Sequence, residues 1–230
     1  MREASDIHHQ HLSTLVCDHF ICQACGIIDR DPERMRVGHR CPTCSAEERR
    51  RRLAFHANIS LLVDLMQEVF HSEAPALFHD RSSPQGSDIN TVLIFCSLRE
   101  ALLTNFLVEN LLAKRVDHEL IKRLLADNKS TSQRMEKLFP SVVGAKWEAA
   151  VTQLSQTNSV NYEDVSSFIR EAASVRNRFI HEGIPWGMTR DLSKRCINSM
   201  GKMVSLFVAL HNEYTHPVIR GRDAESPLPG

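Results

Sequence analysis

The sequence predicts a mainly α-helical protein that carries a small, metal-stabilised module near its N-terminus. Five of the seven cysteines fall within residues 17–45, and four of them form two pairs with C-x2-C spacing. From residue 46 to about residue 215, apolar residues recur mostly at helical intervals, between segments rich in glycine, proline and serine. These two observations separate a short cysteine module from a longer helical domain.

A chain of 230 residues is long enough for one large domain, or for a small module and a medium-sized domain. We expect five segments along it, which are a flexible N-terminus at 1–16, a metal module at 17–45, a connecting helix and loop at 46–90, a helical domain at 91–215 and a flexible tail at 216–230.

The cysteine pairs predict a structural metal site. Cys22 and Cys25 form the first pair, Cys41 and Cys44 the second, and fifteen residues separate the pairs. Two such knuckles place four thiolates in a tetrahedron, which suits one structural zinc ion per chain. The C-x2-C-G and C-P-x-C patterns resemble a zinc ribbon or rubredoxin knuckle built from short β-hairpins, so iron is a minor alternative to zinc. Four unliganded thiols are a further alternative.

A closed site of four cysteines leaves no position for water, so the metal is expected to be structural and not catalytic. His19 and His39 flank the site and are possible replacement ligands. Cys17 is expected to be a buried neighbour, with a competing fifth thiol as the alternative. Cys96 and Cys196 fall in predicted helices and are expected to be small core residues.

The apolar spacing predicts one helix in the connecting segment and six in the helical domain. The helix over 90–115 is apolar nearly all round, so it is expected at the centre of the domain. Asn161 is the predicted N-cap of a later helix, and Gly183 its predicted end. Pro140 is expected to stop another. The predicted helices span 46–70, 90–115, 117–125, 131–139, 145–154, 161–183 and 189–214.

The charge balance excludes a nucleic-acid binder that relies on bulk electrostatics. Lys and Arg number 28 and so do Asp and Glu, so any contact with RNA must use local patches. Two Trp and two Tyr are too few for a base-stacking platform. The apolar stretch 91–113 is interrupted by charged and amide residues, and no apolar run follows the N-terminus. A cytoplasmic protein without membrane contact is therefore expected, in a reducing compartment that fits the odd cysteine count.

The segment Arg176-Asn177-Arg178-Phe179-Ile180-His181 is the strongest candidate for a functional site. The fork of Arg176 can hold a phosphate with two hydrogen bonds, and His181 can exchange a proton because an ordinary histidine has a pKa of about 6.5. Asn177 is expected to orient the imidazole or the substrate. On a continuous helix the positions 176 and 181 are about 140° apart. A shared site therefore works better if His181 lies where the helix ends.

The same Arg–His spacing occurs at Arg34–His39 and at Arg51–His56, so spacing alone is weak evidence for a functional site. Only the match at 176–181 has an asparagine after the arginine and closes a long amphipathic segment. This match resembles the R-x4-6-H motif of HEPN domains, and Ser97-Leu98-Arg99-Glu100-Ala101-Leu102-Leu103 resembles the first core helix of these proteins. The resemblance covers residues 91–215.

The resemblance implies a HEPN-like helical bundle that acts as a metal-independent endoribonuclease. His181 would transfer protons, Arg176 would stabilise charge, Asn177 would assist them, and Glu100 is a possible supporting acid. The 2′-hydroxyl of RNA would be the nucleophile, and the product would be a 2′,3′-cyclic phosphate. HEPN domains typically dimerise with their motifs facing one cleft, so a homodimer is implied, and toxin or anti-phage defence roles are common in the family. Some HEPN toxins carry a modifiable Tyr where this chain has Gly183, so that regulation is not expected.

Further arginines are possible phosphate contacts, namely Arg178 and the run Arg49, Arg50, Arg51 and Arg52. The alternative for the run is a solvated helix face paired with Glu47 and Glu48.

Three rival interpretations stay open. Arg176 and His181 are ordinary surface residues in the simplest of them. In the second, a non-catalytic HEPN module binds a nucleotide or a partner, and the zinc ribbon docks a protein or an antitoxin. In the third, a zinc-ribbon regulator binds nucleic acid through residues 17–56, and the helices only dimerise.

Overall fold

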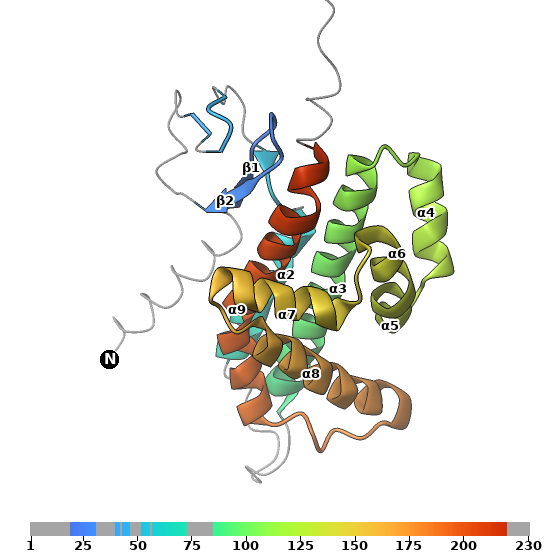
Figure 1. The fold of residues 1–230 in the computed structure, drawn as a ribbon. Coiled ribbons are helices and arrows are strands. Elements are labelled where there is room, and N and C mark those ends of the chain that lie inside the picture. The colour runs from blue at the N-terminus through green and yellow to red at the C-terminus, as the bar shows by residue number, and fades with distance from the viewer. Residues whose placement is uncertain are drawn as a thin grey trace, which may run out of the picture.

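The computed structural model describes residues 19–30, 40–41, 43–46, 52–55, 57–72 and 85–219. Over these residues the chain is mainly helical, with a small antiparallel sheet near its N-terminal end (Figure 1). The predictions for residues 1–16, Cys17, Arg34, His39, Arg49–Arg51 and His56 lie outside the described residues, as does the tail from residue 220.

Three short strands form the sheet, in the order β2-β1-β3. They are β1 (His19–Ile21), β2 (Ile28–Arg30) and β3 (Arg52–Leu53), and both pairings are antiparallel. The prediction of a helix over 46–70 was wrong at its N-terminal end. Arg52 and Leu53 form β3 instead, where they pair with Ile21 and Phe20 in extended conformation. The helix begins only at Ala57. The charged run before it has a helical composition, but the open edge of β1 gives the backbone of residues 52–53 a better set of hydrogen-bond partners.

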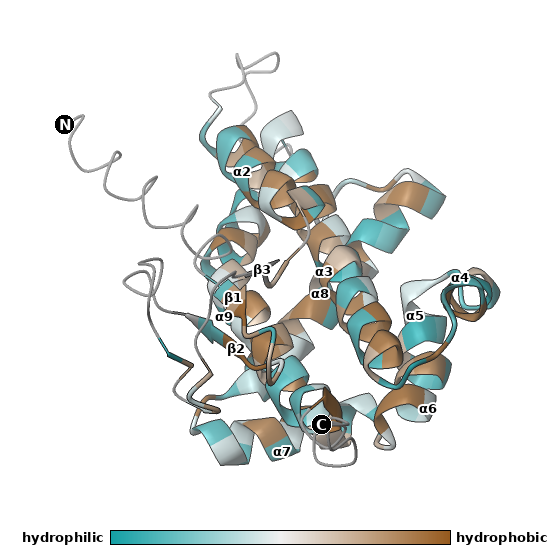
Figure 2. Ribbon diagram, turned by 90° about the horizontal axis from the view of Figure 1, so that it is seen from above, coloured by the Kyte–Doolittle hydropathy of each residue, from teal (hydrophilic) through white to brown (hydrophobic). Residues whose placement is uncertain are grey.

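The central helix is α3 (Gly86–Ala113), which packs mainly against α2 (Ala57–His71) and α9 (Arg190–Tyr214). It starts four residues before the predicted position 90 and is buried on nearly all sides, as its apolar sequence indicates. Among the described residues α3 alone is long and apolar enough to cross a membrane, but 61% of its most apolar stretch is buried inside the protein. It is therefore a core helix, with brown apolar residues along much of its length in Figure 2.

The next segment is a broken helix whose middle turn is π-helical. α4 (His118–Asp127) is followed by α5 (Thr131–Gln133), the π turn η2 (Arg134–Leu138) and α6 (Phe139–Val143). The prediction that Pro140 stops this helix was wrong, since the chain stays helical to Val143. Proline lacks an N–H, and the wider π turn just before it lets the Phe139 N–H bond to the Arg134 carbonyl instead of following the α-helical ladder.

Two further helices precede α9, and local capping explains their boundaries. They are α7 (Trp147–Asn158) and α8 (Tyr162–Glu182). Asn161 caps α8 as predicted, because its Oδ1 accepts a hydrogen bond from the Asp164 N–H at 3.1 Å. Gly183 ends the helix with a left-handed φ of 69°. Thr189 caps α9 through the Leu192 N–H.

The sheet is docked on the C-terminal end of α9 by side-chain hydrogen bonds. The Asn212 amide donates to the Ile28 carbonyl and accepts from the Ile28 N–H, both at 2.8 Å. His211 Nε2 lies 2.8 Å from the Gly26 carbonyl oxygen. Residues 216–219 add a further helical turn in place of the predicted tail, and Ile219 packs directly against Gly26.

Candidate functional site

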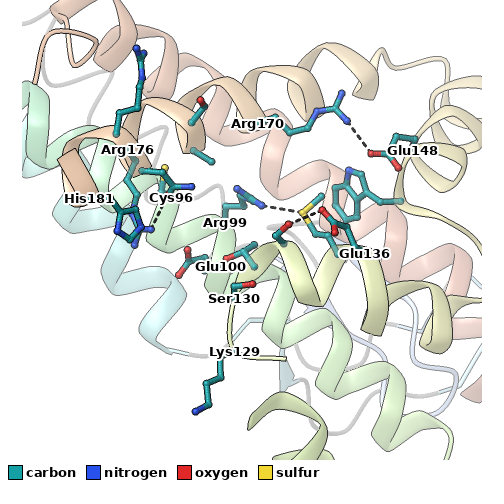
Figure 3. Close-up of a pocket in the computed structure, with 18 of the residues that line it drawn as sticks. Cys96, Arg99, Glu100, Lys129, Ser130, Glu136, Glu148, Arg170, Arg176 and His181 are labelled. Atoms are coloured by element: carbon teal, nitrogen blue, oxygen red, sulfur yellow. Dashed lines mark hydrogen bonds and ion pairs between the residues drawn. The ribbon is translucent and has the colours of Figure 1, made fainter. Parts of the chain in front are cut away.

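A pocket of about 1050 Å³ opens between α3, the η2 region, the start of α7 and the second half of α8 (Figure 3). Its lining combines residues from parts of the chain that are far apart in sequence. These are Cys96, Arg99, Glu100, Lys129, Ser130, Thr131, Ser132, Met135, Glu136, Pro140, Lys146, Trp147, Glu148, Arg170, Ala173, Ser174, Arg176, Asn177, Arg178, His181 and Glu182.

The Arg–His segment lies on the last turns of α8, and its side chains reach this pocket. Arg176 is half-buried, whereas Asn177 and His181 are exposed. The helix is regular through both Arg176 and His181 and ends one residue later, with its C-cap at Gly183 as predicted. The side chains line one pocket despite their separation around the helix because the arginine side chain is long.

Asn177 contacts the arginine of this segment. Its Oδ1 accepts a hydrogen bond from Arg176 Nη1 at 3.1 Å. The expectation that Asn177 orients the imidazole or the substrate stays a prediction, and in this structure its amide oxygen contacts the guanidinium. This contact leaves the other donors of the arginine fork for a ligand.

Glu100 and Arg178 also line the pocket, from α3 and α8. Within the described part of the chain, no hydrogen bond or ion pair joins the Glu100 carboxylate to Arg176 or His181. The pocket thus brings together Glu100, Arg176, Asn177, Arg178 and His181. Of the predicted phosphate-binding run, Arg52 is described only by its backbone in β3, and the other three arginines lie outside the described residues.

Arg99 is a pocket residue that the sequence interpretation did not select. Only 8% of it is exposed, yet it lines the cavity beside Glu100. Its Nη2 lies 3.0 Å from the Met135 sulfur. The signal in the sequence was a charged residue within the most apolar helix of the chain, where a charge is costly unless something compensates it.

Positive charge exceeds negative charge in the pocket lining. Six Arg or Lys side chains and four Glu side chains contribute to it. Arg170 and Glu148 neutralise each other in an ion pair at 3.0 Å. Glu136 accepts a hydrogen bond from the Ser132 hydroxyl at 2.7 Å. The remaining surplus of guanidinium and ammonium groups makes the pocket suited to an anion.

The one cysteine in the pocket lining is not a nucleophile. Burial raises the pKa of Cys96 to about 11, so its thiol is protonated at neutral pH. Burial also raises the pKa of Cys196, which lies in α9. Both residues belong to the core, as expected from the sequence.

The second candidate site is the cluster of Cys22, Cys25, Cys41 and Cys44. All four sulfurs lie within 4.8 Å of one another. The Cys22–Cys44 and Cys25–Cys41 sulfur pairs are each 3.8 Å apart. Zinc–sulfur bonds of about 2.3 Å in a tetrahedron separate the sulfurs by about 3.8 Å, so the cluster has the dimensions of a four-thiolate metal site. The separations are far too long for disulfide bonds.

Two thiols of this cluster are held protonated by burial, whereas, against the effect of burial, backbone hydrogen bonds from Cys44 and Thr43 lower the pKa of Cys41. Burial raises the pKa of Cys22 and raises that of Cys25 to about 11. A divalent metal would offset this penalty by direct coordination. No residue of the cluster lines the pocket, so the metal ligands and the Arg–His segment are separate groups of residues.

We find no protein-family model, no curated protein and no solved structure that matches this chain.

Proposed function

We propose that this protein is a HEPN-type, metal-independent endoribonuclease whose active site is the pocket beside the last turns of α8. The observation that carries the proposal is that Arg176, Asn177 and His181 share one positively charged pocket with Glu100 of α3. Phosphodiesters are anionic, and a pocket that combines an arginine fork with a histidine has the groups that phosphodiester transfer requires.

In this proposal the RNA supplies its own nucleophile. A histidine removes the 2′-hydroxyl proton, and the 2′-oxygen attacks the adjacent phosphorus. The bond from phosphorus to the 5′-oxygen breaks, and that oxygen receives a proton. The products are a 2′,3′-cyclic phosphate and a free 5′-hydroxyl. Arg176 stabilises the charge that develops on the phosphoryl oxygens, held in place by the Asn177 contact.

Two proton transfers are needed, and the pocket lining contains one histidine, His181. We infer that a second copy of the chain supplies the other across a twofold axis. Support comes from exposed apolar residues next to His181. Ile180 is 50%, Ile184 37% and Trp186 73% exposed, and a surface of this kind is typical of an interface.

The decisive experiment is RNA cleavage by purified, folded protein, with the products analysed for cyclic phosphate. Reactions with and without EDTA are run side by side, and zinc content is measured in each. His181→Ala should reduce the rate by about 100-fold or more. His118→Ala is the matched control, because His118 is exposed on α4 and does not line the pocket. Absence of cleavage by the zinc-loaded wild type would contradict the proposal.

Light scattering tests the homodimer. Trp186→Ser should shift the protein towards monomer and lower the cleavage rate, because it removes the most exposed apolar residue beside the site. Leu61→Ser on α2, 66% exposed, is the control and should change neither. A wild type that is monomeric while it cleaves RNA would contradict the composite site.

The alternative function is a non-catalytic module that binds a nucleotide or a partner. The observation that favours it is the single histidine in the pocket, since binding needs the arginines but no proton transfer. Under this alternative Arg176→Ala loses nucleotide binding, and the wild type binds RNA without cutting it.

The cysteine cluster is proposed to hold one structural zinc per chain and to dock a protein partner, such as an antitoxin. The nuclease is proposed to act in the cytoplasm as a toxin or in anti-phage defence. Expression of the wild type should then arrest bacterial growth, whereas His181→Ala should not. Normal growth together with intact cellular RNA would contradict the toxin role.

A further inference from the structure

Arg99 is a buried arginine for whose charge the described residues supply no oppositely charged partner within ion-pair distance. Its neighbours on α3 are core residues, since Leu98 is fully buried and Leu102 is 1% exposed. Arg99 itself is 8% exposed. A guanidinium stays protonated under all ordinary conditions, so its burial carries a large penalty unless an anion or several strong acceptors surround it.

The contacts of Arg99 do not supply that compensation. Its one hydrogen-bond acceptor among the described residues is the Met135 sulfur at 3.0 Å, which is neutral and weak. No carboxylate of the described chain lies within ion-pair distance of it. Burial lowers its pKa, Cys96 and Glu100 raise it, and the nearby charge of Arg176 lowers it further.

Four other arginines of the described chain donate hydrogen bonds to oxygen atoms. They contact a carbonyl and a hydroxyl, or a carboxylate, and the four clear cases are Arg134, Arg170, Arg190 and Arg195. Arg99 differs from all four, although it is the least exposed of these arginines. Arg99 is the buried arginine of the described chain, and none of its hydrogen bonds there goes to an oxygen atom.

The pocket gives this guanidinium access to a ligand. Arg99 lines the cavity from α3, and Arg176 lines it from α8 (Figure 3). Two like charges near one another repel, and an anion between or beside them removes that repulsion. The hydroxyls of Ser130 and Thr131, on the same lining, add further donors.

We propose that Arg99 is the anchor of an anion-binding site, in which its guanidinium binds a phosphate group of the RNA beside Arg176. This inference rests on the proposed function for the identity of the ligand, and it adds a residue from α3 to the substrate-binding set. Arg99 holds the phosphate oxygens in the ground state, whereas His181 moves protons. The charge of the ligand supplies the compensation that the described part of the chain does not.

The test compares Arg99→Met with the wild type as full-length, zinc-loaded protein. Methionine has a similar length without the charge, and it can pack on Met135. In phosphate-free buffer, Arg99→Met should melt at the same temperature as the wild type or higher, because it removes an uncompensated buried charge. Inorganic phosphate and pyrophosphate should raise the melting temperature of the wild type and leave that of the variant unchanged.

Affinity is measured with a short single-stranded RNA carrying 2′-O-methyl groups, which binds but cannot be cut. Arg99→Met should weaken binding by at least about tenfold, and Arg99→Lys by less, because lysine keeps the charge but loses the fork. Arg195→Met is the control, since Arg195 is exposed on α9 and does not line the pocket. It should bind this RNA like the wild type.

Two results would overturn the anion site. One is unchanged RNA affinity in Arg99→Met. The other is a lower melting temperature in phosphate-free buffer together with a retained response to phosphate, which would make Arg99 a structural residue. If Arg99→Met does not fold, Arg99→Lys takes its place, and unchanged affinity in that variant overturns the site.

The outcomes also separate this inference from the proposed nuclease. If the 2′-O-methyl RNA binds through Arg99 but ordinary RNA is not cut, the anion site is supported and the nuclease proposal is contradicted. If Arg99→Met cleaves RNA with the KM and kcat of the wild type, the nuclease proposal is supported and the anion site at Arg99 is contradicted. A response to inorganic phosphate without any binding of RNA would overturn RNA as the source of the phosphate.

Discussion

At the scale of single residues, a few polar side chains join elements that are distant in sequence. Asn212 is the clearest case, because both ends of its amide bond to the backbone of Ile28. Asp88 plays a comparable part at the other end of the bundle, where it is 2% exposed and accepts hydrogen bonds from Arg190 and Ser193. Such contacts place the sheet and the helices relative to one another more specifically than apolar packing does.

Replacing Asn212 should loosen the attachment of the sheet. Asn212→Ala removes two hydrogen bonds and leaves both Ile28 backbone groups without these partners, so it should cost about 1–3 kcal/mol. Urea denaturation followed by circular dichroism measures this cost. Asn212→Asp is the matched control, because it keeps the acceptor and loses the donor, and its cost should be intermediate if the two bonds act separately. Wild-type stability in Asn212→Ala would show that the contact is not needed.

The ion pair between α8 and α9 should be visible in the titration of Glu171. Arg195 donates two hydrogen bonds to its carboxylate, and these hold the pKa of Glu171 below its ordinary value of 4.5. A carboxylate with a lowered pKa in the folded state stabilises the fold at pH values above its ordinary pKa. This contribution is lost as the pH falls through the lowered pKa. Because both side chains are exposed, the effect on stability is below about 1 kcal/mol. In Arg195→Met, NMR should show the Glu171 pKa returning to its ordinary range. An unchanged pKa would contradict the assignment.

At the scale of elements, the end of α8 determines where the Arg–His segment meets the pocket. Gly183 takes the left-handed conformation, and its N–H bonds to the Phe179 carbonyl at 3.0 Å. Glycine has no Cβ and adopts this conformation without strain. The helix therefore ends at Glu182, one residue after His181, and the exposed apolar residues of the next loop lie close to the histidine in the chain.

Gly183→Ala should strain this helix end. No atom lies within 4 Å of the added Cβ, so the cost is conformational only, about 1–2 kcal/mol. Because the strain falls next to His181, RNA cleavage or RNA binding should fall as well. Gly144→Ala is the matched control. Its φ is 84°, its Cβ would also meet open space, and it does not line the pocket. The two variants should lose similar stability in thermal unfolding, and an equal change in their RNA activity would contradict a special role for the α8 end.

At the scale of the whole molecule, the cysteine cluster and the helical domain form a connected unit. The backbone next to Cys25 is held by His211 of α9, and Ile219 packs on the same glycine. The cluster contributes little apolar burial of its own, so metal binding is expected to supply much of its stability. Loss of the metal should then also loosen the end of α9.

Metal removal should lower the stability of the whole chain. Cys41→Ser should reduce the metal content from one ion per chain and lower the melting temperature, since a ligand present at 1,000 times its Kd contributes about 4 kcal/mol. Native mass spectrometry and thermal unfolding measure both quantities. Cys96→Ala is the control, because Cys96 lies outside the cluster and should leave the metal content unchanged. Full metal content in Cys41→Ser would contradict its role as a ligand.

Local features of the fold were predictable because they depend on neighbouring residues. The caps at Asn161 and Thr189, the end of α8 at Gly183 and the central place of α3 all follow from side chains within a turn or two. The two errors in the helices have non-local causes. The strand at Arg52–Leu53 forms because β1 offers an edge, and the helix passes Pro140 because a π turn absorbs the missing N–H.

The sequence by itself determined that this protein has a helical domain, a four-cysteine cluster and an Arg–His segment at a helix end. Each of these features can be predicted from the spacing of residues that lie close together in the chain. Only the tertiary structure decided which residues surround that segment. Arg99 and Glu100 meet Arg176 and His181 because α3 and α8 pack on one another, and Asn177 turns towards Arg176. Side-chain packing between distant elements sets these contacts, and no local spacing encodes them.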